Sequence, residues 1–487
     1  MLLKVVVISL YAVMIIALGY FGMRKTRSFA DFFLGGGEIG PWMTAFTYAA
    51  AYFSAVLFIG FAGQIGWGFG LSALWIAVGN AFVGVLGVWG ILGYRIKKMS
   101  MEYGVQTMPE FFEKRYHSRF LKFFSALAVF VFFVPYSAAV FMGLSYLFRA
   151  TFGMNYTASL VVMGGFTAIY MVMGGYRSMT MVDVFFGSIM VFGVIVLFGF
   201  VLRHGGGLQN ISEGLSSIDP ALTRIVGPPG AWRLFCLVFL TSVAPFGMPQ
   251  LVQKFYAIKD KKSIHIGMVA STCFAFLIAG VAYFTGAAAR LFLTPENAPQ
   301  AFAKGKPVFD ALVPELFARI VPGSLSVLML LLILSASMST LAAIVLLSSS
   351  SVVKDLYAGF VRKNTDDRAL TRFMRAFSTL FIILSVVFAY FRPATIVAIL
   401  AISWGAIGSV FLGPFVWGIF TKRVNKLGAI ASAVLGLGTC IVLYATGSSS
   451  PEAGTIGMIV SLAVNPLFSL LRPGDTVPRP VPGERQL

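Results

Sequence analysis

The chain has 487 residues, of which 58% are hydrophobic and 11% are charged, and its mean hydropathy is +0.87. This composition excludes a string of soluble domains and indicates an integral membrane protein with many spans. The formal net charge of +19 could suggest a nucleic-acid partner. However, the basic residues are spread over the short segments between apolar stretches, which is typical of a membrane protein, so no nucleic-acid partner is expected.

Apolar stretches long enough to cross a bilayer recur along the whole chain. They predict an all-α integral membrane protein with about 13 transmembrane helices. In chain order, the stretches are residues 4–23, 40–64, 71–94, 121–149, 156–176, 182–203, 233–256, 265–290, 323–353, 373–391, 395–420, 428–446 and 454–471.

The Lys and Arg residues predict the orientation of these helices. If the amino terminus lies outside, 27 of the 37 basic residues fall in segments that face the cytoplasm, Lys254 in residues 254–262 among them. Because cytoplasmic loops collect Lys and Arg, we expect a multi-pass plasma-membrane protein with its carboxyl terminus in the cytoplasm. Beyond the lipid bilayer and a small solute, no obligatory protein partner is indicated.

Two of the predicted spans contain residues that interrupt a helix. Small residues break the apolar run at 48–55, and glycines follow at positions 60, 63 and 66. Two prolines and a glycine lie within residues 241–249, where they cannot sustain a regular helix because each proline removes a hydrogen bond. Broken helices at membrane depth line cavities, and transporters place binding sites there.

A third segment, residues 334–341, places hydroxyl groups inside an apolar helix. Ala336 lies three residues before Ser339 and four before Thr340, so the three share one helical face. Hydroxyl oxygens suit hard cations, of which Na⁺ is one. The ordinary alternative is that both hydroxyls bond to their own helix backbone.

Together with the motif Gly-Gly-Tyr-Arg at 174–177, Asp183 and the run Lys-Asp-Leu-Tyr at 354–357, these features resemble the sodium:solute symporter family. The resemblance runs from about residue 5 to about residue 470. It implies a five-plus-five inverted repeat with broken helices. The implied divisions are an extra helix and first cytoplasmic loop at 1–39, repeats at 40–203 and 233–420, an extracellular loop at 204–232, two further helices at 421–471 and a cytoplasmic tail at 472–487.

The resemblance implies a secondary active symporter, not an enzyme, that couples inward Na⁺ movement to uptake of a small organic solute. The implied ligands of the transported Na⁺ are the carbonyls of Ala50, Phe53 and Ala336 and the hydroxyls of Ser339 and Thr340. Five uncharged oxygens favour a monovalent ion over Ca²⁺, which normally recruits carboxylates.

Asp183 and two alanines bear on how the ion leaves and how many ions bind. The resemblance places Asp183 on the route by which Na⁺ leaves, and the alternative is an acid that caps the helix beginning there. Some family members, the sialic acid carriers among them, bind a second sodium through hydroxyls three and four residues after the first serine of the pair. This chain has Ala342 and Ala343 there, which implies one Na⁺ per solute.

The residues that contact the solute are harder to identify. The candidates are Ser54, Tyr136, Thr241, Ser242, Phe246 and Trp404, and ordinary helix packing is the alternative for each. Tyr136 matches a pocket tyrosine of the proline-type carriers, whereas Tyr52, Thr241 and Pro245 depart from them. No charge is placed near the membrane centre in the broken helices. The solute is therefore expected to be neutral, zwitterionic or an anion held by helix amino ends, such as an amino acid, pantothenate or a monocarboxylate.

Other classes of protein make different demands on the sequence. A proton-coupled carrier needs a protonatable group at the ion site, and Ala336, Ser339 and Thr340 offer none. A passive channel or facilitator needs a continuous polar pore, whereas the polar residues here cluster at two helix breaks. A membrane sensor needs an output domain, for which no segment is visible.

Overall fold

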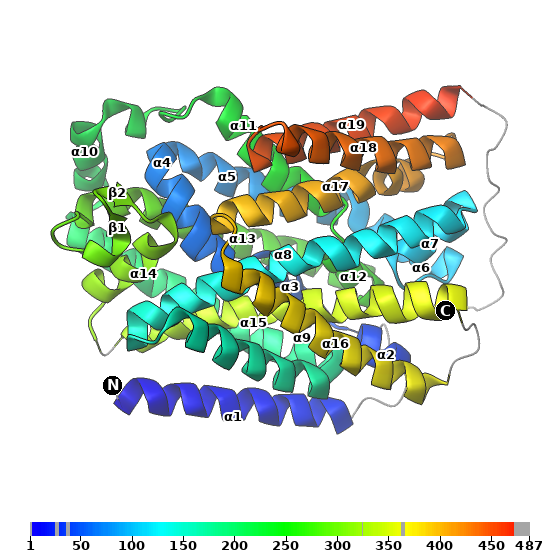
Figure 1. Ribbon diagram of the computed structural model, residues 1–487, viewed down its shortest axis with the longest axis horizontal. Helices are drawn as coiled ribbons and strands as arrows, with labels where there is room; N and C mark the ends of the chain where they lie inside the picture. Colours follow the sequence, from blue (N-terminus) through cyan, green and yellow to red (C-terminus); the bar gives the residue numbers. More distant parts are fainter. Residues whose placement is uncertain (1, 25–28, 36–38, 324, 362–365, 472–487) are drawn as a thin grey trace.

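A computed structural model describes residues 2–24, 29–35, 39–323, 325–361 and 366–471 (Figure 1). The first half of the chain is a series of helices. Their bounds are α1 Leu2–Arg24, α2 Phe29–Leu34, α3 Pro41–Tyr52, η2 Val56–Gly66, α4 Trp67–Phe69, η3 Gly70–Ala73, α5 Leu74–Val78, η4 Gly79–Gly93, α6 Tyr94–Tyr103, α7 Met108–Tyr116, α8 Arg119–Phe152 and α9 Tyr156–Gly205.

The second half is also helical apart from one short hairpin, in which β1 pairs antiparallel with β2. Its elements are α10 Leu208–Ile218, η5 Pro220–Thr223, α11 Ala231–Val243, η6 Ala244–Phe246, α12 Pro249–Ala257, α13 Lys261–Phe292, η7 Pro299–Ala301, β1 Phe302–Ala303, β2 Lys306–Pro307, α14 Phe309–Ile320, α15 Ser326–Ser350, η8 Ser351–Val361, α16 Asp367–Phe391, α17 Ile396–Phe420, α18 Lys426–Ala445 and α19 Ser450–Leu470.

The number of membrane spans depends on how two long segments are divided. In the described part of the chain, 11 helical segments are long and apolar enough to cross a membrane. Residues 56–103 count there as one segment, although they include the end of one predicted span and all of the next. Residues 156–169 count only as a shorter apolar helix. These two differences account for the gap between 11 segments and the predicted 13.

Helix α9 illustrates this division. Its 50 residues would extend about 75 Å, far more than the hydrocarbon core of about 30 Å. The helix bends at Gly175, whose φ of 61° and ψ of −175° are not helical. The bend lies one residue before the end of the predicted 156–176 span, and the second arm begins there rather than at residue 182.

The centre of the bundle is formed by α15 and α17. The most apolar window of α15 is 94% buried and that of α17 is 89% buried, whereas the value for α1 is 22%. Figure 1 shows α1 along one edge and α18 and α19 along the opposite edge. The hydroxyl-bearing segment of α15 therefore lies in the interior, where unsatisfied polar groups are costly.

Glycines let the first broken helix approach its neighbours closely. A Cβ atom at Gly286 of α13 would overlap the carbonyl oxygen of Ala62 in η2, and one at Gly66 would lie 2.8 Å from the Gly286 backbone. Such backbone contacts between helices require small residues. They hold η2 against α13.

Candidate functional site

The first broken helix is interrupted at Phe53 and Ser54. Helix α3 ends at Tyr52, and Phe53 is extended with φ −112° and ψ 129°. The hydroxyl of Ser54 accepts a hydrogen bond from Val56 N–H at 3.2 Å, at the start of η2. Because helical bonding stops at this break, carbonyl groups of α3 become available to other partners.

Thr340 of α15 lies directly opposite this break. Its hydroxyl donates to the Ala336 carbonyl at 3.1 Å and lies 3.5 Å from the carbonyl oxygen of Ala50 and 3.4 Å from that of Phe53. Four of the five predicted Na⁺ ligands therefore meet at one point. Three carbonyl oxygens share a single hydroxyl proton there, which leaves lone pairs free for a cation.

The fifth predicted ligand, Ser339, is fully buried, and its hydroxyl has no hydrogen-bond partner in the described structure. It lies beside the carboxylate of Asp183, and so does the hydroxyl of Thr47. Ser339 therefore lies between the oxygens around Thr340 and the acid predicted on the ion's route.

The sequence interpretation did not single out Lys254, a charged residue near the end of the second broken helix. Lys254 lies on α12, inside the membrane-spanning segment 231–257, and is fully buried. It interacts electrostatically with Asp183. A signal was available, because Lys254 falls within the predicted 233–256 stretch and ionisable residues inside a membrane are functional candidates.

A cavity beside the ion site brings together four of the six predicted solute contacts, Ser54, Tyr136, Thr241 and Trp404. Its remaining lining residues are Tyr52, Phe53, Val56, Leu57, Phe61, Asn80, Tyr283 and Leu400. Trp404 packs edge-on against Tyr52 and Tyr136, with ring centroids 5.9 and 6.0 Å apart. The cavity therefore has an aromatic wall, which sequence reasoning found only in part.

The other two predicted contacts do not line this cavity. Ser242 donates to the side-chain oxygen of Asn80 at 3.2 Å and so positions a residue that does line it. Phe246 lies instead against Gly87 of η4. Asn80 carries the amide that a solute could contact, and no sequence motif marked it.

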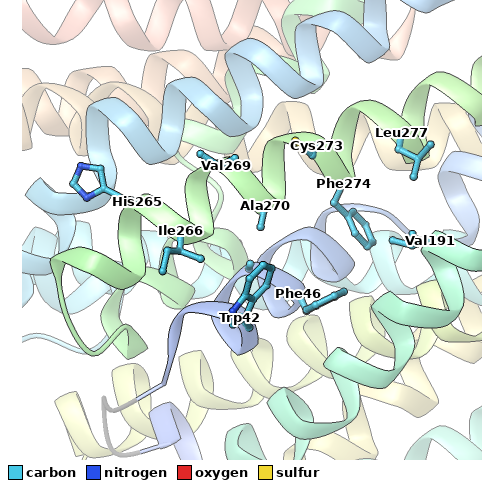
Figure 2. A pocket seen from close by; sticks show the side chains of 11 residues that line it. Trp42, Phe46, Val191, His265, Ile266, Val269, Ala270, Cys273, Phe274 and Leu277 are labelled. Carbon is cyan, nitrogen blue, oxygen red and sulfur yellow. The ribbon is translucent and has the colours of Figure 1, made fainter.

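A further cavity lies elsewhere, between α3, α9 and α13 (Figure 2). Its volume is about 600 Å³, and Figure 2 shows the rings of Trp42 and Phe46 on one side and α13 side chains on the other. The lining is apolar except for His265 and Cys273. It contains none of the predicted ligands, and its chemistry suits hydrocarbon rather than a polar solute.

Groups of three or more His, Cys, Asp or Glu side chains that could hold a metal ion are absent from the described residues. The candidate cation site at Thr340 is formed by the hydroxyl and three carbonyl oxygens. Such a ligand set suits a weakly held monovalent ion.

Comparison with known proteins shows the family to which the chain belongs. The sequence model of the sodium:solute symporter family matches residues 32–436. The chain belongs to the sodium:solute symporter family. It therefore couples Na⁺ to the uptake of a small solute across a membrane and is not an enzyme.

Two curated relatives in this family are similar along most of their length. The high-affinity proline transporter PutP of Bacillus subtilis is 30% identical over 445 residues, which cover 89% of this chain and 90% of that protein. The sodium/pantothenate symporter of Haemophilus influenzae is 27% identical over 441 residues, covering 88% and 87%.

A solved structure shows the same fold. The structure described as the substrate-bound outward-open state of a Na⁺-coupled sialic acid symporter matches with a TM-score of 0.82 at 17% identity, over 98% of this chain and 99% of that one. Its fold agrees with the all-α membrane architecture that the sequence predicts.

Polar contacts join α7 and the loop before it to η8. Lys354 of η8 lies 3.1 Å from a carboxylate oxygen of Glu110 in α7 and donates to Gln106 at 2.6 Å. Asp355 accepts a hydrogen bond from the Thr107 hydroxyl at 2.7 Å. Burial acts to raise the pKa of Glu110, but Lys354 and a backbone hydrogen bond from Gln106 hold that pKa below its ordinary value. The carboxylate therefore stays charged and keeps α7 attached to η8.

Proposed function

We propose that the transported Na⁺ binds between the carbonyls of Ala50, Phe53 and Ala336 and the hydroxyls of Ser339 and Thr340. The observation that supports this most directly is the contact of one Thr340 hydroxyl with all three carbonyl oxygens. Those groups come from the break in the first broken helix and from α15, so an ion bound there would tie the two elements together.

We further propose that Asp183 receives the ion as it leaves this site. The carboxylate is buried next to Ser339, and a buried acid in a membrane segment is a functional candidate. Asp183 lies within the second arm of α9 rather than at its first residue, which disfavours the helix-cap alternative.

The solute site in this proposal is the cavity lined by Ser54, Tyr136, Thr241 and Trp404, with Ser242 positioning Asn80. Phe246 is retained only as a packing residue. The relatives named for proline and for pantothenate are similarly identical to this chain, and both compounds carry a carboxylate. We propose a small amino acid, pantothenate or a monocarboxylate as the solute, since the hydroxyls and amide can hold a carboxylate without a cationic side chain.

The proposed placement is the plasma membrane, with the amino terminus outside and the carboxyl terminus in the cytoplasm. The end that holds Glu110 and Lys354 would then face the cytoplasm. The proposed repeats are residues 40–203 and 233–420, preceded by residues 1–39, separated by the 204–232 loop and followed by 421–471 and the tail at 472–487. The excess of Lys and Arg in the inward segments supports this orientation.

Removal of single hydroxyls tests the ion site. Ser339→Ala and Thr340→Ala each take one oxygen from an ion in a dry site. We expect each to weaken binding of radioactive Na⁺ to the purified protein at least about tenfold, or about 1.4 kcal/mol. Ser337→Ala is the matched control, because its hydroxyl donates to the Ile333 carbonyl of its own helix at 2.6 Å. If both variants bound Na⁺ like the wild type, the ion site would be assigned wrongly.

The solute is identified by counterflow uptake into proteoliposomes with labelled L-proline, pantothenate and short monocarboxylates, each with and without Na⁺. We expect one of these classes to be taken up only with Na⁺, and Trp404→Ala to abolish that uptake. Uptake that is equal with and without Na⁺ would favour a facilitator instead.

A further inference from the structure

Two opposite charges lie in the interior close to the ion site. Asp183 on α9 and Lys254 on α12 are both fully buried. Neither carboxylate oxygen of Asp183 nor the ammonium of Lys254 has a hydrogen-bond partner among the described residues. An isolated buried charge costs several kcal/mol unless it is paired, so this arrangement needs a reason.

The position of the ammonium indicates what it does. It lies over the ring of Tyr176, 4.9 Å from the ring centroid, where a cation is attracted by the aromatic face. Tyr176 and Asp183 are seven residues apart on the second arm of α9, so they share one face, about 10.5 Å apart along the helix axis. The flexible lysine stem can therefore move its charge from the ring toward the carboxylate.

Besides Lys254, the groups beside the Asp183 carboxylate among the described residues are uncharged. Ser339, a proposed Na⁺ ligand, and Thr47 each place a hydroxyl beside it, and both hydroxyls lack a hydrogen-bond partner in the described structure. These oxygens could receive a cation that leaves the Thr340 site. A carboxylate in a dry site would, however, hold that cation strongly, because attraction between charges is large at low dielectric.

We propose that Lys254 is a tethered cation that displaces Na⁺ from Asp183 and then takes its place until the next ion arrives. This inference rests on the proposed role of Asp183 in ion exit. While Na⁺ is at Asp183, the ammonium stays over Tyr176. As Na⁺ leaves, the ammonium moves to the carboxylate, so the acid is not left uncompensated.

The same proposal accounts for the missing second ion ligands. Ala342 and Ala343 of α15 offer methyl groups where a second sodium site would need hydroxyls. Lys254 supplies from within the protein the positive charge that a second ion would bring to Asp183. With Lys254 compensating the negative charge of Asp183, one transported Na⁺ is enough and no second ion is needed.

The test uses radioactive Na⁺ alone, with binding and release measured on the purified full-length protein. Lys254→Met keeps an unbranched, flexible side chain that is one atom shorter, and it removes the charge. We expect this variant to bind Na⁺ more tightly and to release it about tenfold more slowly, because Asp183 then retains the ion. Adding Asp183→Asn to Lys254→Met should restore Na⁺ release to within about threefold of the wild-type rate. The effects of the two substitutions on the release rate would then be clearly non-additive in a double-mutant cycle.

Two further variants keep this test decisive. Lys254→Arg retains the charge and should release Na⁺ at nearly the normal rate. Lys97→Met is the control, since Lys97 donates to the Tyr256 carbonyl at 3.3 Å, and it should change nothing. If Lys254→Met does not fold, recovery of folding in the double variant supports the pairing, and failure to recover overturns it.

The results also separate this inference from the ion-site proposal. Unchanged release in Lys254→Met, or strictly additive effects of the two changes, would overturn the tethered cation. The loss of Na⁺ binding in Thr340→Ala would stand regardless. Wild-type Na⁺ binding in Ser339→Ala and Thr340→Ala would instead overturn the ion site itself.

Discussion

Thr340 shows how a single side chain can define an ion site. Its hydroxyl has one proton, yet three carbonyl oxygens lie within 3.5 Å of it. Without an ion, the single hydroxyl proton cannot make a full hydrogen bond to all three carbonyl oxygens at once, and unsatisfied polar groups are unfavourable in a buried position. A cation that accepts lone pairs from all three oxygens and from the hydroxyl removes this conflict.

Asp183 gives a prediction about turnover. Asp183→Asn removes the charge that we place on the exit route but keeps the shape of the side chain. We expect solute turnover in proteoliposomes to fall about tenfold or more, because Lys254 loses its counter-charge. Equilibrium solute binding should change much less. A large loss of solute affinity at unchanged turnover would contradict the exit role.

Asp310 of α14 gives a prediction about pH. One carboxylate oxygen accepts a hydrogen bond from Ile396 N–H at 3.3 Å, and burial raises the pKa of Asp310 to about 7. The fold therefore favours the neutral acid, so stability is lost as the pH rises from about 4 to about 7. Asp310→Asn keeps the acceptor and never ionises. At pH 8 we expect its melting temperature to exceed that of the wild type by about 2 °C or more.

The difference in melting temperature between Asp310→Asn and the wild type should vanish near pH 4, where the wild-type acid is also neutral. Asp260→Asn is the control, because Asp260 is exposed and hydrogen bonds from the Ser263 backbone and hydroxyl lower its pKa. If Asp310→Asn raised the melting temperature equally at both pH values, the charge of the Asp310 carboxylate would not be the cause.

At the scale of elements, the bend in α9 divides one continuous helix of 50 residues into two arms. The bend depends on Gly175, whose positive φ with extended ψ is accessible almost only to glycine. A Cβ atom there would lie 2.6 Å from the Phe32 ring and 2.9 Å from the Phe32 carbonyl oxygen. Both the backbone and the packing therefore require glycine, and the second arm that carries Asp183 is oriented by it.

Substitution of this glycine tests that reading. Gly175→Ala should destabilise the protein by about 1–3 kcal/mol through backbone strain alone, as measured by thermal unfolding in detergent. Gly199→Ala, in the same helix with open space around the added methyl group, should be neutral or slightly stabilising. Equal effects at the two positions would mean that the bend does not constrain residue 175.

For the whole molecule, we predict one Na⁺ per solute, because Lys254 supplies the positive charge that a second ion would bring to Asp183. One charge that crosses 100 mV supplies about 2.3 kcal/mol, and a tenfold Na⁺ gradient adds about 1.4 kcal/mol. Together they could concentrate a neutral solute about 500-fold. Reversal-potential or dual-isotope flux measurements in proteoliposomes should give a ratio of one. A ratio of two would show that water or a carbonyl group replaces the hydroxyls absent at Ala342 and Ala343.

The sequence by itself determined the features that depend only on residues close together along the chain. Long apolar runs predicted the spans, because the bilayer requires about 20 apolar residues for each helix. Pro245 and Pro249 predicted the second break, because proline removes a helical hydrogen bond wherever it lies. The common face of Ala336, Ser339 and Thr340 follows from the helical repeat alone. The family resemblance then assigned a chemical role to that face.

Only the tertiary structure decided which distant segments meet. It brought Thr340 to the carbonyls of Ala50 and Phe53, turned Phe246 away from the cavity, and placed Asn80 beside it. It also placed Lys254 near Asp183, although 71 positions separate them in the chain. Hydropathy cannot distinguish a lysine that reaches the cytoplasm from one held inside, because the environment of its ammonium is set by helices that pack from elsewhere in the chain.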